Sequence, residues 1–231
     1  MTQTHTVHPT QLIGIGGRKR HGKDAFASLI GEQDPDAWIV TGMSVALFEA
    51  ALVCDPLIPL ARPHRRRWRR RLSETSPAIL YLRERLRIER FKHVRLSHLV
   101  MAVGETAAKE VPEVRQFLQR LGTDVGRDMI DQDVWVRAAG RKIEQLRAQG
   151  KNVVITGIRY PNELAMVQRL GGTTFWVERP GMPVDASDSH VSEHALSLRD
   201  FDHAIMNIGT LDDLREQALS WVKIRPQETA H

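Results

Sequence analysis

The stretch Leu12-Ile-Gly-Ile-Gly-Gly-Arg-Lys-Arg-His-Gly-Lys-Asp24 decides the fold. Its first four residues form a short apolar run typical of a buried strand, and residues 25–30 have the pattern of a helix that begins there. A glycine turn between a strand and a helix can wrap a phosphate chain, because backbone N–H groups and the positive end of the helix dipole converge on it. Lys23 is placed to reach the β and γ phosphates. The stretch therefore predicts a phosphate-binding loop.

Two other interpretations of this loop can be weighed against the sequence. A dinucleotide-binding fingerprint would begin with Gly14 and Gly16, but Lys19 occupies the position of its third glycine, which excludes that interpretation. The alternative that stays open is a plain glycine turn between a strand and a helix, with an incidental lysine.

Asp24 stands where the common form of this loop has a Ser or Thr whose hydroxyl contacts Mg²⁺. A carboxylate is a suitable hard-oxygen ligand for Mg²⁺, directly or through water, so Asp24 is the candidate metal ligand. It also brings negative charge close to a triphosphate. The neighbouring Arg18, Lys19 and Arg20 either compensate that charge or are solvated loop side chains.

The rest of the chain alternates between strand and helix patterns. Thr210 followed by Asp213 has the spacing of a capping box in front of the last helix. Such alternation favours an α/β fold, with a mostly parallel sheet and helices on both faces. Residues 1–231 are expected to form a single domain with an arginine-rich helical insertion at about residues 55–98. Further strands are expected at residues 38–41, 153–156 and 173–177, and further helices at residues 45–53, 135–146, 162–170 and 211–222.

Composition excludes several classes of protein. The 231 residues are 42% hydrophobic and 26% charged, so neither a disordered nor a fibrous chain is expected. Cys54 is the single cysteine, which excludes an intramolecular disulfide framework and a zinc thiolate cluster. No apolar run has the length of a membrane span, and the first ten residues lack the pattern of a signal peptide. A cytoplasmic protein without membrane partners is therefore expected.

The formal net charge of +5 is unevenly distributed. Residues 62–95 hold 13 of the 33 basic and 3 of the 28 acidic residues, so the remainder of the chain is mildly acidic. Three interpretations of this stretch stay open: an arginine-bearing lid over phosphates, a nucleic-acid-binding segment that includes Trp68, and a solvated amphipathic helix. The helix is favoured for residues 83–95, and a mobile basic insertion for residues 65–71.

Five marks occur in order along the chain. They are Lys19-Arg-His-Gly-Lys-Asp24, Thr41-Gly-Met-Ser44, residues 112–127 with Asp133-Val-Trp-Val136, Ile155-Thr-Gly-Ile-Arg-Tyr-Pro-Asn-Glu163, and Val177-Glu-Arg-Pro180 with Asp188-Ser-His-Val-Ser-Glu193. With these marks the chain resembles the bacteriophage deoxynucleoside monophosphate kinases, a branch of the P-loop nucleotide kinases. The resemblance runs from the first strand to about Leu198, apart from the insertion. It implies a P-loop kinase fold and transfer of the γ-phosphoryl group of ATP, with Mg²⁺, to the 5′-phosphate of deoxynucleoside monophosphates for phage DNA synthesis.

Phosphoryl transfer between two polyanions depends more on positioning and charge neutralisation than on a nucleophilic side chain. Arginine suits this task because its planar fork binds phosphate in bidentate fashion. The catalytic candidates are Lys23, Arg127 and Arg159, where Arg127 lies in an expected Gly-Thr-x-x-Gly-Arg turn and Arg159 directly follows a strand.

The resemblance also implies two sets of binding residues. ATP would contact Gly17, Lys19, Arg20, His21, Gly22, Lys23, Asp24, Ala25 and Arg179. The acceptor nucleotide would contact Ser44, Arg115, Gln119, Asp124, Arg127, Trp135 and Glu163.

Several of these residues have a structural alternative. Trp135 can stack on the acceptor base or pack in the core, and Arg179 can hold the adenine or lie in an ordinary turn. Asn162 and Glu163 can bind sugar or base edges or cap the helix that begins there, and capping is favoured for Asn162. For Arg127 and Arg159, the alternative is a surface salt bridge.

One departure concerns the metal. Relatives often carry an Asp in the run that corresponds to Ile155-Thr-Gly-Ile, where this chain has Gly157. The Mg²⁺ site is then expected to depend on Asp24 and the phosphates, or on an acid from elsewhere in the chain.

A motif of another enzyme class is also present. His190-Val-Ser-Glu-His194 matches the inverted zinc-peptidase pattern, but its surroundings have the composition of a loop and little chain remains for a third ligand. In the kinase interpretation, Asp188, His190 and Glu193 belong to a mobile loop over the nucleotide. Two alternatives to the main function stay open: a P-loop kinase of another small phosphate acceptor, and a nucleic-acid-binding P-loop protein. A homodimer is compatible with the sequence.

Overall fold

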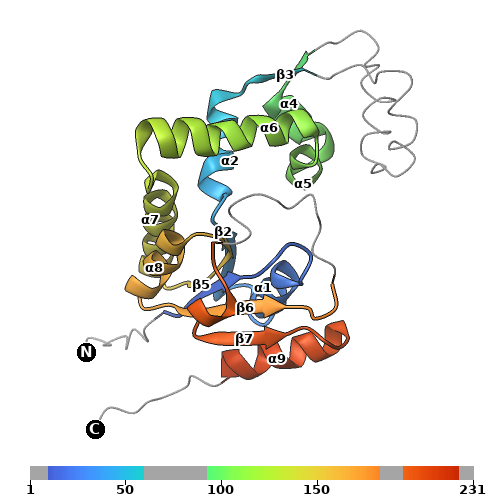
Figure 1. Cartoon of the computed structure of the whole chain (residues 1–231), viewed down its shortest axis with the longest axis vertical. Helices are drawn as coiled ribbons and strands as arrows, with labels where there is room; N and C mark the ends of the chain where they lie inside the picture. The colour runs from blue at the N-terminus through green and yellow to red at the C-terminus, as the bar shows by residue number, and fades with distance from the viewer. Residues whose placement is uncertain (1–9, 60–92, 183–194, 224–231) are drawn as a thin grey trace, which may run out of the picture. The chain divides into compact units, whose positions relative to one another are not determined.

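A computed structural model describes residues 10–59, 93–182 and 195–223, which divide into two compact units (Figure 1). The first unit consists of residues 1–45 and 135–231, and the second consists of residues 46–134. Within the described ranges, no helix is both long and apolar enough to cross a membrane.

The first unit is built on a five-stranded sheet in the order β2-β5-β1-β6-β7, and every pairing in it is parallel. Parallel strands need crossover connections, which the helices between them supply. The α/β fold predicted from the sequence is confirmed, and it is consistent with a P-loop kinase. The strands are β1 (Leu12–Gly16), β2 (Trp38–Gly42), β5 (Asn152–Ile158), β6 (Thr173–Glu178) and β7 (His203–Met206).

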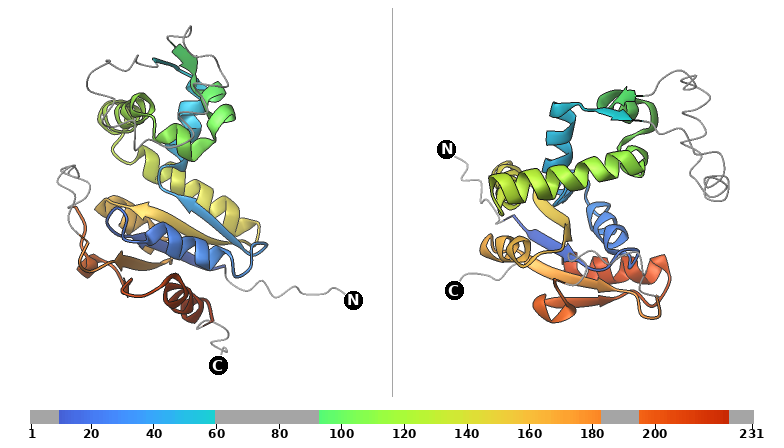
Figure 2. Two further views of the ribbon diagram at one scale, coloured as in Figure 1. Left: turned by 90° about the vertical axis from the view of Figure 1, so that its right-hand side faces the viewer. Right: turned by 45° about the horizontal axis from the view of Figure 1, so that its top comes forward.

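Helices cover both faces of this sheet, as the two views in Figure 2 show. They are α1 (Lys23–Gly31), α7 (Val134–Ala148), α8 (Pro161–Arg169) and α9 (Leu211–Lys223), and a short 3₁₀ turn, η5 (Leu198–Asp200), precedes β7. Each of the predicted strands and helices of this unit is present, with bounds that differ by a few residues. β7 was not predicted, because it is four residues long and only Ile205 in it is buried.

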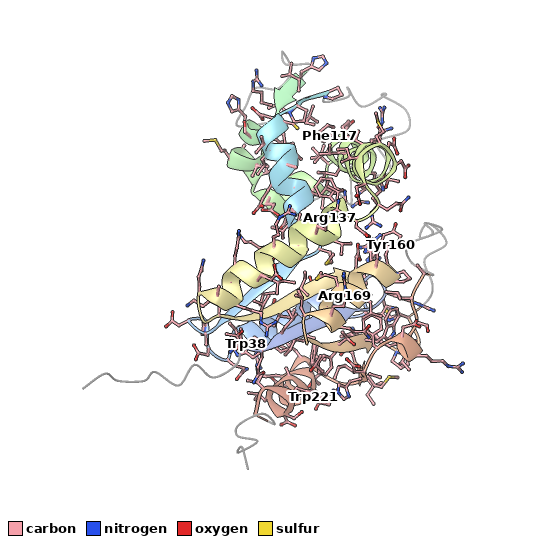
Figure 3. The ribbon with its side chains drawn as sticks, turned by 90° about the vertical axis from the view of Figure 1, so that its left-hand side faces the viewer. Trp38, Phe117, Arg137, Tyr160, Arg169 and Trp221 are labelled. Carbon is pink, nitrogen blue, oxygen red and sulfur yellow. The ribbon has the colours of Figure 1, made fainter. Side chains whose placement is uncertain are left out.

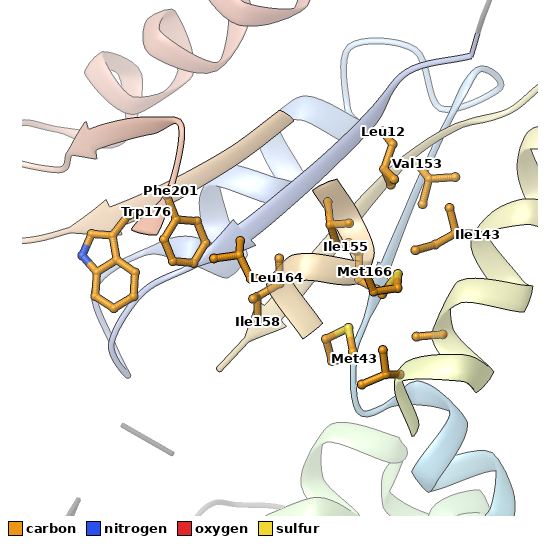
Figure 4. Close-up of a cluster of buried hydrophobic side chains, with 13 residues drawn as sticks. Leu12, Met43, Ile143, Val153, Ile155, Ile158, Leu164, Met166, Trp176 and Phe201 are labelled. Atoms are coloured by element: carbon orange, nitrogen blue, oxygen red, sulfur yellow. The ribbon is translucent and has the colours of Figure 1, made fainter. Parts of the chain in front are cut away.

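Side chains on β1, β5 and β6 alternate between two hydrophobic clusters, because successive residues of a strand point to opposite faces. Ile13, Ile15 and Phe175 pack with α1 and α9, and Trp38 and Trp221, both labelled in Figure 3, pack on this side. Leu12 and Ile155 pack with α7 and α8 on the other side (Figure 4). With both faces covered, the central strand β1 is buried along its whole length.

The second unit is mostly helical. Its core contains Ala51, Ile58, Leu96, Leu99, Ala108, Val111 and Val114. Its elements are α2 (Val45–Cys54), the antiparallel pair β3 (Leu57–Pro59) and β4 (His93–Arg95), then α4 (Leu96–Val103), α5 (Glu105–Lys109), α6 (Pro112–Arg120) and η3 (Leu121–Ile130).

The two ends of the predicted insertion meet in this second unit. Asp55 accepts a hydrogen bond from the backbone N–H of Ser97 at 2.8 Å and lies 3.5 Å from the guanidinium of Arg95. The Ser97 N–H is the main reason why the pKa of Asp55 is lowered. Most of the arginine-rich stretch, residues 60–92, lies outside the described residues, so its predicted helical character stays a prediction.

The first prediction concerns the core of the sheet. Phe175 is 1% exposed and contacts both Phe26 and Trp221. Phe175→Ala should lower the free energy of unfolding by about 3–5 kcal/mol, because it removes transfer energy and leaves a cavity. Ile208→Ala is the control, because Ile208 is 77% exposed and its loss should cost less than about 0.5 kcal/mol. Denaturant unfolding measures both, and equal midpoints would contradict this account of the core.

The second prediction concerns pH. The backbone N–H and hydroxyl of Thr210 donate to Asp213, which confirms the predicted capping box and holds the pKa of Asp213 below its ordinary value of 3.8. A carboxyl whose pKa is lowered on folding stabilises the fold above its unfolded pKa, and this contribution is lost as pH falls through the folded pKa. Asp213→Asn should therefore lower the melting temperature at neutral pH and converge with the wild type in acid.

The matched control is Asp212→Asn, in the same first turn, since Asp212 pairs with Arg215 instead. Melting curves recorded from pH 7 to pH 2 measure all three proteins. A gap between wild type and Asp213→Asn that stays constant across this range would show that the cap does not depend on ionisation.

Candidate functional site

The connection from β1 to α1 has the backbone of a tight phosphate-binding loop. Three of its residues have positive φ: Gly17 at 142°, Arg20 at 66° and Gly22 at 99°. A turn is closed by the N–H of His21, which donates to the carbonyl of Arg18 at 3.3 Å. Gly22 is the N-cap of α1, so the loop delivers the chain directly to the N-terminus of this helix.

The two loop glycines are required by close packing as well as by their dihedral angles. A Cβ on Gly17 would lie 2.4 Å from the carbonyl oxygen of Val177 in β6. A Cβ on Gly22 would lie 2.4 Å from the side-chain nitrogen of Asn207, directly after β7. The loop therefore packs against the ends of two strands, where no side chain fits.

The beginning of α1 is suited to an anion. Its N-cap, Gly22, supplies no side-chain cap, so the first N–H groups of the helix are placed to bind a ligand. Lys23 is buried, and its ammonium lies 3.6 Å from the carboxylate of Asp24. The Asp24 side chain is 74% exposed, so the carboxylate faces solvent while the lysine lies beneath it.

Two arginines flank this loop. β1 lies between β5 and β6 in the sheet, Arg159 directly follows β5, and Arg179 directly follows β6. The strands are parallel, so both arginines lie at the same edge of the sheet as the loop, where ligands of open α/β sheets bind. Ser44, two residues after β2, belongs to this edge as well.

A bulge in β5 lies beside the loop. Ile15 pairs with Thr156 but Gly16 pairs with Ile158, so Gly157 is an extra residue, with φ of 79°. A positive φ of this size favours glycine, and a bulge bends its strand. Relatives often carry an Asp near this position. In this chain Gly157 permits the backbone conformation of the bulge.

Glu163 organises the turn that carries Arg159. Its carboxylate accepts hydrogen bonds from the backbone N–H groups of Arg159 at 2.8 Å and Tyr160 at 3.2 Å, and its side chain is buried. Tyr160 and Arg169 mark the two ends of α8 in Figure 3. Asn162 accepts from the N–H of Glu163 at 3.0 Å. Both residues take part in capping, and Glu163, which was expected to contact the acceptor, binds the two N–H groups that precede the helix.

Four predicted acceptor residues lie in the second unit, on α6 and η3: Arg115, Gln119, Asp124 and Arg127. Arg115 pairs with Glu110 at 3.0 Å, and Asp124 lies 3.7 Å from Arg120. The expected turn around Arg127 is wrong, because residues 121–130 form a widened helix in which the N–H of Asp131 bonds the carbonyl of Gly126. A Cβ on Gly122 would lie 3.0 Å from the side chain of Leu47. Close packing therefore accounts for one of the two glycines that suggested a turn.

Trp135 is the second residue of α7 and is partly buried. It does not belong to the buried cluster beneath this helix, to which Val136, Ala139 and Ile143 contribute. Its prediction as an acceptor contact stays a prediction. The residues Asp188, His190 and Glu193, and the whole His190–His194 pattern, lie outside the described residues.

Asn207 is a residue that sequence reasoning missed. It is buried, and its side chain donates to the carbonyl of His21 at 3.0 Å. The signal in the sequence would have been an amide directly after a strand, but β7 itself was not recognised. The buried Asn207 amide therefore joins the end of β7 to the phosphate-binding loop.

The described residues contain no group of three or more acidic, histidine or cysteine side chains that could hold a metal alone. Asp24, the predicted Mg²⁺ ligand, is exposed at the start of α1, and its assignment to the metal stays a prediction.

Comparison with known proteins adds an observation that is independent of the loop. The family model described as deoxynucleotide monophosphate kinase matches residues 73–218, more than half of the chain. The chain belongs to the deoxynucleotide monophosphate kinase family. Since the matched region begins after Asp24, the family assignment and the loop geometry use different parts of the chain.

Individual relatives agree with the family. The chain is 29% identical over 112 residues to the deoxynucleotide monophosphate kinase of Enterobacteria phage T4, which covers 48% of this chain and 46% of that protein. It is 29% identical over 136 residues to a putative deoxynucleotide monophosphate kinase of Acanthamoeba polyphaga mimivirus, with coverages of 52% and 69%. An uncharacterized protein of Ictalurid herpesvirus 1 is 41% identical over 92 residues, which are 38% of each chain. The chain thus spans less than half of the phage T4 and herpesvirus relatives.

The third prediction concerns the loop glycines. Gly22→Ala should weaken ATP binding at least about tenfold, because a side chain disfavours the left-handed backbone and the new Cβ would displace Asn207. The control is Gly150→Ala, which changes a glycine of similar φ, 78°, with open space around it, in the turn before β5 at the opposite edge. Calorimetric titration with Mg²⁺ and ATP measures both. Equal weakening by the two variants would refute a specific role for the Gly22 contact.

Proposed function

We propose that the protein transfers the γ-phosphoryl group of ATP, with Mg²⁺, to the 5′-phosphate of a deoxynucleoside monophosphate and so makes the diphosphate. The observation that carries this proposal is the β1–α1 loop, with its buried Lys23, in a chain of the deoxynucleotide monophosphate kinase family. The loop supports a triphosphate donor, and the family supports the acceptor.

The donor side follows from the loop. A triphosphate at the start of α1 would accept hydrogen bonds from the first N–H groups of the helix, which have no side-chain cap. In the free protein the Lys23 ammonium is close to the Asp24 carboxylate. We propose that it exchanges this partner for the β and γ phosphates, and that Asp24 is then directed to Mg²⁺. Mg²⁺ would neutralise charge on the phosphates as the γ-phosphoryl group is transferred.

Arg159 and Arg179 are proposed to act on opposite sides of the loop. Arg159 follows β5, and its backbone position is fixed by the Glu163 carboxylate, so its guanidinium can neutralise charge on the migrating phosphoryl group. Arg179 follows β6 and is proposed to contact the adenine. No covalent intermediate is required, because the chain has only to align two phosphates and compensate their charge.

The acceptor contacts remain proposals. They are Ser44 and Trp135 in the first unit, Glu163 beneath Arg159, and Arg115, Gln119, Asp124 and Arg127 on α6 and η3. We also retain as proposals that residues 1–231 act as a single kinase domain, that the enzyme works in the cytoplasm of a host cell, and that its diphosphate product serves phage DNA synthesis.

Two alternatives share the donor site. A kinase of another small phosphate acceptor would have the same loop, and the family assignment favours the deoxynucleotide over it. A nucleic-acid-binding P-loop protein would depend on the arginine-rich stretch, which lies mostly outside the described residues.

The fourth prediction tests the function. Purified protein with ATP, Mg²⁺ and each deoxynucleoside monophosphate in turn should release the matching diphosphate, detected by chromatography. Lys23→Ala should abolish turnover, because the phosphates lose their buried cation, and should leave the melting temperature nearly unchanged. Lys151→Ala is the control, since Lys151 precedes β5 at the opposite edge of the sheet and contacts the carbonyl of Asp36.

The acceptor panel should include phage-modified bases and small phosphorylated molecules other than nucleotides. Turnover with a non-nucleotide acceptor alone would favour the first alternative. No product from any nucleotide, with salt-dependent DNA binding instead, would favour the second.

A further inference from the structure

We propose that His21 and Asn207 are positioning residues that anchor the phosphate-binding loop to the ends of β6 and β7 and thereby set its affinity for the triphosphate. We call these two residues the loop anchor. The inference rests on the proposed function in one respect, that the ligand of the loop is ATP.

The loop anchor makes two hydrogen bonds to other parts of the chain through His21, and a third holds Asn207 in place. The ring nitrogen Nδ1 of His21 accepts from the backbone N–H of Arg179 at 3.0 Å. The carbonyl oxygen of His21 accepts from the side-chain Nδ2 of Asn207 at 3.0 Å. Asn207 is itself positioned by its backbone N–H, which donates to the carbonyl of Glu178 at 2.8 Å. His21 is therefore bound on its side chain by the chain after β6 and on its backbone by the residue after β7.

Because both residues are buried, the loss of either hydrogen bond is costly. His21 is 6% exposed and Asn207 is 9% exposed, so a lost partner is poorly replaced by water. Gly22, with φ of 99°, lies against the Asn207 side chain, and Arg20, the other neighbour of His21, has φ of 66°. A non-glycine residue holds a left-handed conformation only where its surroundings impose it. The anchor lies where it can impose the conformation of both neighbours.

The consequence for binding is preorganisation. The loop binds phosphate through N–H groups that must all point inward, and a loop that holds this form in only a fraction of molecules binds more weakly by that fraction. The bond to Arg179 also joins the phosphate-binding loop to the segment proposed to contact the adenine. His21 thus acts through hydrogen-bond geometry, and its role requires an acceptor at Nδ1 rather than a positive charge.

This requirement suggests a conservative replacement. The Oδ1 atom of an asparagine can occupy the place of Nδ1 of a histidine and accept the same N–H, whereas alanine offers no acceptor. Asn207→Asp is the corresponding change on the other side, since a carboxylate has nearly the same shape but cannot donate to the His21 carbonyl.

The experiment compares His21→Ala, His21→Asn, Asn207→Asp and a control, Asn152→Ala, in the full chain. Asn152 also bonds a backbone N–H through its side chain, that of Gln11 at 2.8 Å, but at the opposite edge of the sheet. Three quantities are measured: the dissociation constant of ATP with Mg²⁺ by calorimetry, amide hydrogen exchange at Gly22 to Ala25 without ligand, and the KM values of donor and acceptor.

We expect His21→Ala and Asn207→Asp to weaken ATP binding about tenfold or more and to accelerate exchange of the loop amides. The KM of ATP should rise while the KM of the acceptor stays unchanged. His21→Asn should recover most of the affinity, and Asn152→Ala should change neither affinity nor loop exchange.

Wild-type ATP affinity and loop exchange in both His21→Ala and Asn207→Asp would overturn the proposal. Equal losses in Asn152→Ala would also overturn it, because they would indicate general destabilisation. If His21→Ala does not fold, His21→Asn and Asn207→Asp decide: the first must bind ATP well and the second poorly. A wild-type protein that binds ATP but phosphorylates no deoxynucleotide would sink the proposed function and leave the anchor intact.

Discussion

The contact between Gly17 and the carbonyl oxygen of Val177 is the constraint on which the candidate site depends. At this point the chain leaves the central strand of the sheet and passes so close to β6 that no Cβ would fit. The close approach is available because β1 and β6 are neighbours in a parallel sheet with covered faces. The sheet therefore fixes the starting point of the loop, and the loop in turn fixes the first N–H groups of α1.

The distribution of charge follows from the same geometry. A phosphate site needs cations near one point, and here Lys23 and Arg159 belong to the carboxyl edge of two adjacent strands, β1 and β5. Arg179, proposed to contact the adenine, follows the neighbouring β6 at the same edge. Net charge describes none of this, because the excess of +5 comes from a stretch that belongs to none of these strands. Position along the sheet is what makes these three residues candidates for the nucleotide site.

Much of the first unit could be predicted from sequence because its elements obey simple periods. Residues buried on both faces give short apolar runs, and the capping box at Thr210 and Asp213 was recognised from spacing alone.

Other features could not be predicted from the sequence. β7 was not predicted because a strand with one buried residue in four shows no alternating hydrophobic pattern. The widened helix around Arg127 was taken for a turn, since Gly122 and Gly126 are both buried there for packing. Gly157, where relatives often carry an Asp, forms a bulge, and the Glu163 carboxylate binds backbone N–H groups. Contacts such as that of Asn207 with His21 join residues far apart in sequence, so local periodicity does not predict them.

The most direct test of the central claim is a titration of isotope-labelled protein with ATP and Mg²⁺, followed by the backbone amide signals. A phosphate-binding loop at the start of α1 predicts that the signals of Gly22, Lys23, Asp24 and Ala25 shift strongly and saturate together, while those of Gly150 to Asn152 at the opposite edge stay in place. Saturable binding in which the loop amides do not move, or in which the largest shifts lie elsewhere, would contradict it.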